Sequence, residues 1–226
     1  MENRKRVVIT GMGVIAPNGT GLENFTSALK EGRSGISFVP ELKELGMSCH
    51  VGGIPTLSES YIGSYLPSYM LNRMESSTLF YGVLAGLEAW KHAGLSKNEE
   101  VDWNAGVIMG AQASDGGLAK SVVSSIFYDK SIRKLSGRTA EQTMTSSLSA
   151  YLAGYLGLGN CSMTNSAACA TGTEAIYMAY KKIKNGEATC ILSGSSEGNS
   201  PFVWSVLDKI RALSSESNHD PEGASK

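Results

Sequence analysis

The stretch NSAACATGTEAIYMAYKKIKNG, residues 165–186, decides how the rest of this sequence is interpreted. It begins with small residues around Cys169 and continues with apolar residues at helical spacing, which predicts an amphipathic helix over residues 173–184. Gly186 is placed to end that helix. The short run CSMT at residues 161–164 precedes the stretch and predicts a strand. The sequence therefore predicts that Cys169 lies at a turn from a strand into the start of a helix.

Strands and helices alternate on both sides of this turn. Short apolar runs predict strands at residues 6–9, 105–109 and 188–192, with a further short strand near Val51. Helical spacing of apolar residues predicts helices at residues 22–32, 72–94 and 140–156, while residues 33–70 are expected to be irregular. Alternation of this kind indicates an α/β fold, with a mostly parallel sheet and helices on its faces.

The predicted helices have definite apolar faces. In the helix at residues 22–32 the spacing places Leu22, Phe25 and Leu29 on the buried side. In the helix after Cys169 the inward positions are Ala175, Ile176, Ala179, Tyr180 and Ile183. Gly94 follows the helix at residues 72–94 as a C-terminal cap.

Composition limits the classes of function. The chain has 226 residues, 42% of them hydrophobic, and 20 basic against 21 acidic residues, so its net charge is -1. That balance gives no sign of nucleic-acid binding, and no apolar stretch reaches the roughly 20 residues that span a bilayer. The four cysteines form no CxxC pair, which argues against a zinc site and a disulfide framework. A soluble cytoplasmic protein is expected.

The N-terminal residues MENRKRVVITGMGVIAPNG are charged and then apolar. Gly11, Gly13 and Pro17 interrupt the apolar run, so it predicts a first strand and not a signal peptide. The GxG pattern after this strand lacks the third glycine and the later acidic residue of a dinucleotide site, and no cofactor is expected.

Cys169 is the candidate nucleophile. A helix N-terminus offers unpaired amide groups and the positive end of the helix dipole, and both favour a thiolate. A thiolate suits thioester exchange, because it is also a good leaving group. The alternative interpretation of a cysteine among small residues is a buried structural thiol.

Several motifs in order resemble one family. They are RVVITGMGVIAPNG at residues 6–19, EGRSGI at 31–36, NSAACATGTEAI at 165–176, ILSGSSEGNSP at 191–201 and RALS at 211–214. Together they resemble the N-terminal half of the β-ketoacyl-acyl carrier protein synthases of the I/II class. The similarity extends from residue 6 to the end of the chain.

The resemblance implies a thiolase-like fold built from two similar βαβαβ halves, of which residues 1–226 would be the first, as one domain. It implies a decarboxylative Claisen condensation, in which Cys169 takes an acyl group from a carrier protein and the carbanion formed from malonyl-carrier protein attacks the resulting thioester. The backbone amide of Cys169 would be one of two oxyanion-hole donors. The resemblance also implies a homodimer that meets through residues 140–164.

Some of the family's machinery is missing from this chain. The family's two catalytic histidines, its lysine and its second oxyanion donor belong to the C-terminal half, so a C-terminal half or a second chain is expected to supply them. His50, His92 and His219 match none of those positions and are expected to be surface or loop residues.

Two further residues are matched to substrate contacts. Leu207 takes a position where many members have an aromatic residue on the wall of the acyl pocket. Arg211, within RALS, matches a position that docks the acyl carrier protein, whereas Arg73 alone stands in for the basic cluster expected at residues 69–73. The segment GAQASDGG at residues 110–117 is more polar than the family's usual loop.

Other functions stay open at this point. A non-catalytic partner subunit like a chain-length factor is disfavoured by the intact Cys169. A thiolase or class III synthase that acts on coenzyme A esters is disfavoured by the RALS match, and a purely structural fragment is a third alternative. The sequence leaves fatty acid and polyketide pathways equally open.

Overall fold

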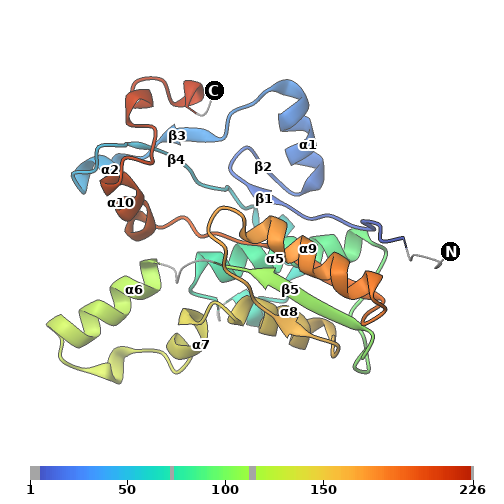
Figure 1. Cartoon of the computed structure of the whole chain (residues 1–226). Helices are drawn as coiled ribbons and strands as arrows, with labels where there is room; N and C mark the ends of the chain where they lie inside the picture. The colour runs from blue at the N-terminus through green and yellow to red at the C-terminus, as the bar shows by residue number, and fades with distance from the viewer. Residues whose placement is uncertain (1–5, 72–73, 112–115, 225–226) are drawn as a thin grey trace.

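A three-stranded parallel sheet forms the centre of the molecule (Figure 1). The computed structural model describes residues 6–71, 74–111 and 116–224. The central strand is β5 (Ala105–Gly110), which pairs in parallel with β6 (Ser162–Met163) on one side and with β7 (Cys190–Ser195) on the other. All six residues of β5 are buried. Such a strand has helices on both faces and no contact with water, so it is built from small and apolar residues.

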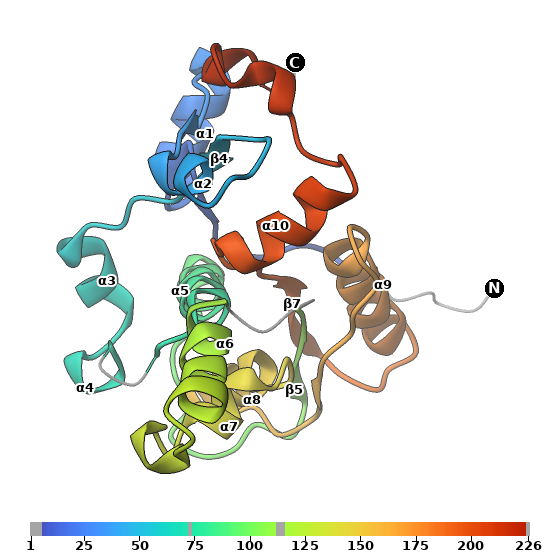
Figure 2. The same cartoon turned by 90° about the vertical axis from the view of Figure 1, so that its left-hand side faces the viewer.

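Helices cover both faces of this sheet. Val107 and Met109 of β5 point toward α5 (Ser77–His92) and α8 (Ser147–Leu156), whereas Ile108 points toward α9 (Thr171–Lys184). The alternation follows from the two-residue period of a strand. Figure 2 shows α5 and α8 on one side of β5 and α9 on the other. The helices α5 and α8 approach closely, since a Cβ at Gly86 would lie 2.9 Å from Leu152.

A second group of elements lies beyond this sheet, at the top of Figure 1. It contains two antiparallel pairs, β1 (Ile15–Ala16) with β2 (Gly19–Thr20) and β3 (Ile36–Phe38) with β4 (Val51–Gly53). The helix α10 (Pro201–Lys209) joins it from the far end of the chain, because Trp204 packs against Leu42 and its neighbours.

The remaining helices surround these two groups of elements. They are α1 (Leu22–Glu31), α2 (Pro40–Glu44), α3 (Glu59–Tyr65), α4 (Ser68–Leu71), α6 (Gly116–Val123) and α7 (Thr139–Thr143), with a π-helix at Ser124–Tyr128 and 3₁₀ turns at Ile132–Lys134, Ser215–Ser217 and Pro221–Gly223. Within the described ranges, the structure has no helix with the length and apolar character needed to cross a bilayer.

The carboxylate of Glu88 fixes the N-terminal segment to α5. Glu88 is buried, and its two oxygens accept hydrogen bonds from the amides of Val14 and Leu22, each at 2.8 Å. A buried carboxylate needs such donors to offset its lost hydration. Burial and the nearby Glu88 carboxylate raise the pKa of the Tyr61 hydroxyl, so Tyr61 is neutral beside this charge.

Most of the expected architecture is confirmed. The sheet is parallel with helices on both faces, and the strands expected near Val51 and residues 105–109 and 161–164 are present. The helix at residues 22–32 is α1, and Gly94 has the left-handed φ of 76° that suits a residue just after a helix. The strand expected at residues 188–192 begins at Cys190 and continues to Ser195.

The strand expected at residues 6–9 is wrong. Residues 6–10 are described without strand pairing, and Val8 and Ile9 are 63% and 76% exposed. A strand needs the edge of another strand for its backbone hydrogen bonds, and none of the described strands offers one here. The chain instead runs along α5, where the amide of Met12 donates to His92 Nδ1 at 3.0 Å.

The helix expected at residues 140–156 is two helices. The segment divides into α7 and α8 because Met144 has extended backbone angles, with φ of -82° and ψ of 128°. The residues at the break favour local bonds over helix continuation, as when the Thr143 hydroxyl donates to the carbonyl of Ala140 at 2.9 Å. Residues 33–70 are also less irregular than expected, since they contain β3, α2, β4, α3 and part of α4.

Some side chains expected to face inward are exposed. Leu29 on α1 and both Ile176 and Tyr180 on α9 are exposed, whereas Ala28, Ala175 and Ala179 are buried. The described part of the chain supplies a packing partner for only the narrow alanine side of these helices. Both helices are therefore present as predicted, but the buried face of each is narrower than the spacing of apolar residues predicts.

The core at the α5–α8 contact gives a stability test. Leu152 is 0% exposed, so Leu152→Ala leaves a cavity and should lower the free energy of unfolding by about 2–5 kcal/mol. The exposed Leu29→Ala is the matched control and should change it by less than about 0.5 kcal/mol. Urea unfolding of the assembled protein measures both. Equal effects of the two substitutions would contradict this description of the core.

Candidate active site

Cys169 lies on the connection between β6 and α9. The strand β6 ends at Met163 and the helix begins at Thr171, so Cys169 is two residues before the first helical residue. It is the exposed cysteine of the four, while Cys49 is buried and Cys161 and Cys190 are half-buried. This is the placement that the sequence predicted for the candidate nucleophile.

The turn before Cys169 has an unusual backbone. Ala168 has a φ of 47°, in the left-handed region that residues with a Cβ rarely adopt. The Ala168 carbonyl accepts hydrogen bonds from the Thr171 amide at 3.0 Å and the Thr171 hydroxyl at 2.6 Å. No hydrogen bond engages the amide of Cys169 within the described residues. That amide is therefore available to a ligand.

The end of β5 packs directly against this turn. The carbonyl of Asn165 accepts from the Ala111 amide at 3.4 Å, and the Asn165 Nδ2 donates to the Thr171 carbonyl at 2.9 Å. Gly110 has no Cβ, and a Cβ there would collide with the Thr171 methyl and lie 2.9 Å from Asn165 Oδ1. The close approach fixes Cys169 at the carboxyl end of the sheet, where open α/β sheets bind their ligands.

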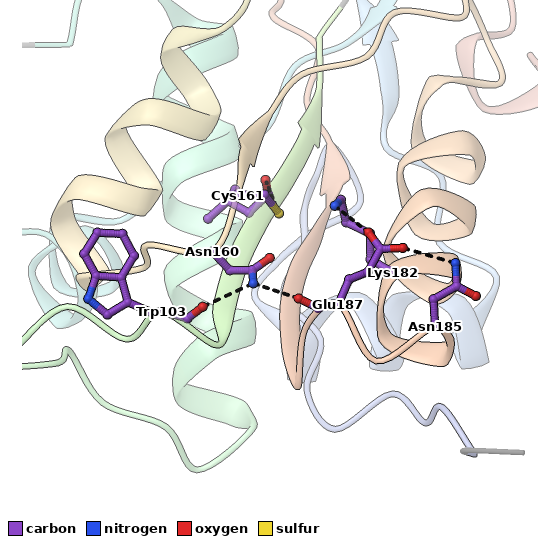
Figure 3. Close-up of polar contacts among 7 residues, drawn as sticks. Trp103, Asn160, Cys161, Lys182, Asn185 and Glu187 are labelled. Carbon is purple, nitrogen blue, oxygen red and sulfur yellow. Dashed lines mark hydrogen bonds and ion pairs between the residues drawn. The ribbon is translucent and has the colours of Figure 1, made fainter. Parts of the chain in front are cut away.

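The amino ends of the strands carry a different set of contacts (Figure 3). Asn160 Nδ2 donates to the carbonyls of Trp103 at 3.1 Å and Glu187 at 2.8 Å, and so connects the segments that lead into all three strands. Lys182 on α9 pairs with the Glu187 carboxylate at 3.0 Å. These contacts align the strands and leave the opposite end of the sheet free for chemistry.

The two half-buried cysteines are poor nucleophiles. Burial raises the pKa of the Cys161 thiol, and the nearby Lys182 and the Val107 carbonyl offset this only in part. Burial and the Asp102 carboxylate raise the pKa of the Cys190 thiol. Both thiols are therefore largely protonated near neutral pH, and a protonated thiol is not the reactive form.

Leu207 and Arg211 lie on α10 and just after it. Figures 1 and 2 place α10 beyond the carboxyl end of the sheet, the same end as the start of α9. Leu207 is 37% exposed, and Arg211 is exposed with a left-handed φ of 60°. No hydrogen bond or ion pair in the described residues joins either side chain to Cys169, so their roles stay predictions.

Asp208 anchors this segment. Its carboxylate accepts from the Ser48 amide at 2.8 Å, the Ser48 hydroxyl at 2.7 Å and the Cys49 amide at 2.9 Å. These bonds, that of the Ser48 hydroxyl first, lower the pKa of Asp208. The Asp208 carbonyl also accepts the Arg211 amide at 2.9 Å. Local sequence patterns do not reveal this anchor, because Ser48 and Asp208 are 160 positions apart.

None of the hydrogen bonds described for the three histidines involves Cys169. His50 Nε2 bonds to the Met47 carbonyl at 2.9 Å, and His92 Nδ1 accepts the Met12 amide. His219 is exposed. Arg73 and residues 112–115 of the segment at 110–117 lie outside the described residues.

Comparisons with known proteins agree with this geometry. A solved β-ketoacyl synthase from Burkholderia phymatum STM815 superposes with a TM-score of 0.84 at 25% identity, covering 96% of this chain and 53% of that one. The fold is therefore thiolase-like. A type II polyketide ketosynthase, solved in complex with its acyl carrier protein, shares the fold with a TM-score of 0.78 at 24% identity, over 94% of this chain and 50% of that one.

Residues 4–226 match the family described as the N-terminal domain of β-ketoacyl synthases, and the chain belongs to that family. It is 29% identical over 222 residues to 3-oxoacyl-[acyl-carrier-protein] synthase 1 of Haemophilus influenzae, covering 98% of this chain and 54% of that protein. It is 32% identical over 228 residues to the synthase 1 of Buchnera aphidicola subsp. Acyrthosiphon pisum, with coverages of 98% and 54%. The chain thus spans about half the length of these relatives.

Selective alkylation tests the assignment of the nucleophile. In the assembled protein, iodoacetamide at neutral pH should label Cys169 first, because it is exposed and the other three thiols are buried or half-buried. Labelling of Cys161 and Cys190 should need more alkaline conditions than labelling of an ordinary thiol, since burial raises both pKa values. Peptide mapping by mass spectrometry measures each site. Earlier labelling of Cys49 would contradict the assignment.

Proposed function

We propose that this chain is the N-terminal half of a β-ketoacyl-acyl carrier protein synthase and that Cys169 is its nucleophile. The observation that carries the proposal is an exposed cysteine, with a free amide, at a strained turn at the start of α9. Membership of the β-ketoacyl synthase family supports acyl transfer as the reaction at this cysteine. An intact Cys169 also argues against a non-catalytic partner subunit.

The first half-reaction takes place at Cys169. The Cys169 sulfur attacks the thioester carbonyl of an acyl-carrier protein, the new C–S bond forms, and the carrier thiolate leaves. The Cys169 amide donates to the oxyanion of the tetrahedral intermediate. Ala167, Ala168 and Ala170 leave the carbonyl room to approach. A soft thiolate suits this exchange, because it both attacks and leaves readily.

The second half-reaction needs groups that this half lacks. Malonyl-carrier protein loses carbon dioxide, the carbanion attacks the acyl-Cys169 carbonyl, and the Cys169 thiolate leaves. Among the described residues, no hydrogen bond joins Cys169 to a histidine: His50 bonds to Met47 and His92 bonds to Met12. A C-terminal half or a second chain therefore supplies the acid–base groups and the second oxyanion donor.

Partner contacts follow from two surface features. Arg211 is exposed near the carboxyl end of the sheet and is suited to dock an acidic carrier protein, while Leu207, partly exposed on the same segment, is suited to line the path of an acyl chain. The outer edge of β6 has no partner among the described strands. An unpaired edge invites pairing with a second copy, which supports a homodimer through residues 140–164 in a cytoplasmic enzyme.

Activity of the separated and assembled halves tests the function. The assembled protein should elongate an acyl chain with malonyl-carrier protein, and Cys169→Ala should abolish this, because no acyl-enzyme forms. Residues 1–226 by themselves should release no carbon dioxide, since each missing acid–base group contributes about 10²–10⁴-fold and an oxyanion donor about 10²–10³-fold. Full condensation by Cys169→Ala would disprove the assignment.

A charge reversal tests the docking role of Arg211. Arg211→Glu should raise the KM for acyl-carrier protein by about 10-fold at low salt and less at high salt, because a surface charge acts on association. Hydrolysis of a small thioester should not change. Arg33→Glu is the matched control, a charge reversal at an exposed arginine just after α1, and should leave both rates unaltered. Equal loss with both substrates would mean that Arg211 has a structural role instead.

A further inference from the structure

The left-handed backbone at Ala168 must be held by its surroundings. This conformation places the Cβ close to the following carbonyl and is unfavourable for an L-residue other than glycine. Such a conformation persists only where the neighbouring structure determines it. Ala168 directly precedes Cys169, so whatever holds Ala168 also sets the direction of the Cys169 sulfur and amide.

The Thr171 hydroxyl makes two hydrogen bonds to the backbone around Ala168. The hydroxyl accepts from the Ala167 amide at 2.8 Å and donates to the Ala168 carbonyl at 2.6 Å. It therefore bonds to the peptide group that precedes Ala167 and to the one that follows Ala168, on either side of the turn, and to neither of those that flank Thr171. The Thr171 side chain is almost completely buried, at 3% exposed.

The position of Thr171 is itself fixed. Its carbonyl accepts from Asn165 Nδ2 at 2.9 Å, and the same nitrogen donates to the Glu174 carboxylate at 3.0 Å. Its methyl lies against Gly110 at the end of β5. The hydroxyl is thus tied to the sheet and to the first turn of α9, and it transmits that fixed position to the turn before Cys169.

We infer that Thr171 is a positioning residue for Cys169: its hydroxyl holds Ala168 left-handed, which aims the sulfur outward and keeps the Cys169 amide free for the oxyanion. Thr171 is buried and does not touch the carrier protein. Loss of the hydroxyl therefore slows acyl transfer at Cys169 and leaves docking intact. The inference rests on the proposed function, because acyl transfer is the reaction that Cys169 is positioned for.

Three variants of the assembled enzyme test the inference. Thr171→Val keeps the shape and removes the hydroxyl, Thr171→Ser keeps the hydroxyl and removes the methyl, and Thr173→Val removes an exposed hydroxyl two residues further on. For Thr171→Val, kcat of acyl transfer and the rate of Cys169 alkylation should fall by about 10-fold or more, with KM for acyl-carrier protein unchanged. Thr171→Ser should restore both rates to within about 3-fold of the wild type.

The outcomes distinguish a positioning role of Thr171 from a loss of folding and from a failure of the proposed function. Thr173→Val should match the wild type, and far-ultraviolet circular dichroism confirms that each variant is folded. Wild-type rates in Thr171→Val, or equal losses in Thr171→Val and Thr171→Ser, would overturn the inference. If the wild type transfers no acyl group but the alkylation rates follow the expected order, the proposed function fails and the positioning role of Thr171 stands.

Discussion

The parallel pairing of β5 with β6 and β7 is the constraint on which the rest of the structure depends. Parallel strands place all their carboxyl ends at one edge, so the residues that follow each strand meet there. Gly110, the turn before Cys169 and the loop into α10 arrive at the same edge for this reason. The Asn160 contacts at the opposite edge keep the three strands in register.

The site combines a rigid base with an open side. Hydrogen bonds of Asn165 and Thr171 hold the turn before Cys169, while Cys169 itself is exposed. The exposed apolar side chains Val8, Ile9 and Ile176 lie on segments around the same sheet, and burial of such surface is the usual basis of association between protein halves. The exposed Cys169 and these apolar side chains therefore both lie on surfaces that the described residues leave uncovered.

The sequence predicted the elements that carry their own local signal. The helix after Cys169 has a clear apolar spacing, and Gly94 and Gly186 end helices with left-handed φ values of 76° and 80°. Residues 6–9 were predicted as a strand because Val7, Val8 and Ile9 favour strands, but propensity cannot supply the neighbouring edge that a strand requires. The break at Met144 was missed because the prediction followed the apolar spacing of residues 148–155 and gave no weight to the Thr and Ser residues around Met144, whose hydroxyls favour local bonds.

At the site, the position of Cys169 was predictable and its support was not. The small residues around it signalled a sharp turn, and the motif made Cys169 the candidate nucleophile. Thr171 was part of that motif, yet nothing in the spacing showed that its hydroxyl returns to Ala167 and Ala168. The Asp208 anchor depends on a contact with Ser48 that only the fold creates. Local patterns reveal which residues are present at a site, whereas long-range contacts decide what holds them.

The contact between Gly110 and Thr171 restricts how this sequence can change over evolutionary time. A Cβ at position 110 would occupy the space of the Thr171 methyl, so a larger residue at 110 requires a smaller one at 171. Serine is the one ordinary replacement at 171 that frees this space and keeps the hydroxyl. Substitutions at the two positions are therefore coupled, and the order in which they arise matters. Alanine at 110 requires serine at 171 first, together with a shift of Asn165 Oδ1, which would lie 2.9 Å from the added Cβ, and the reverse order passes through a protein in which residues 110 and 171 collide.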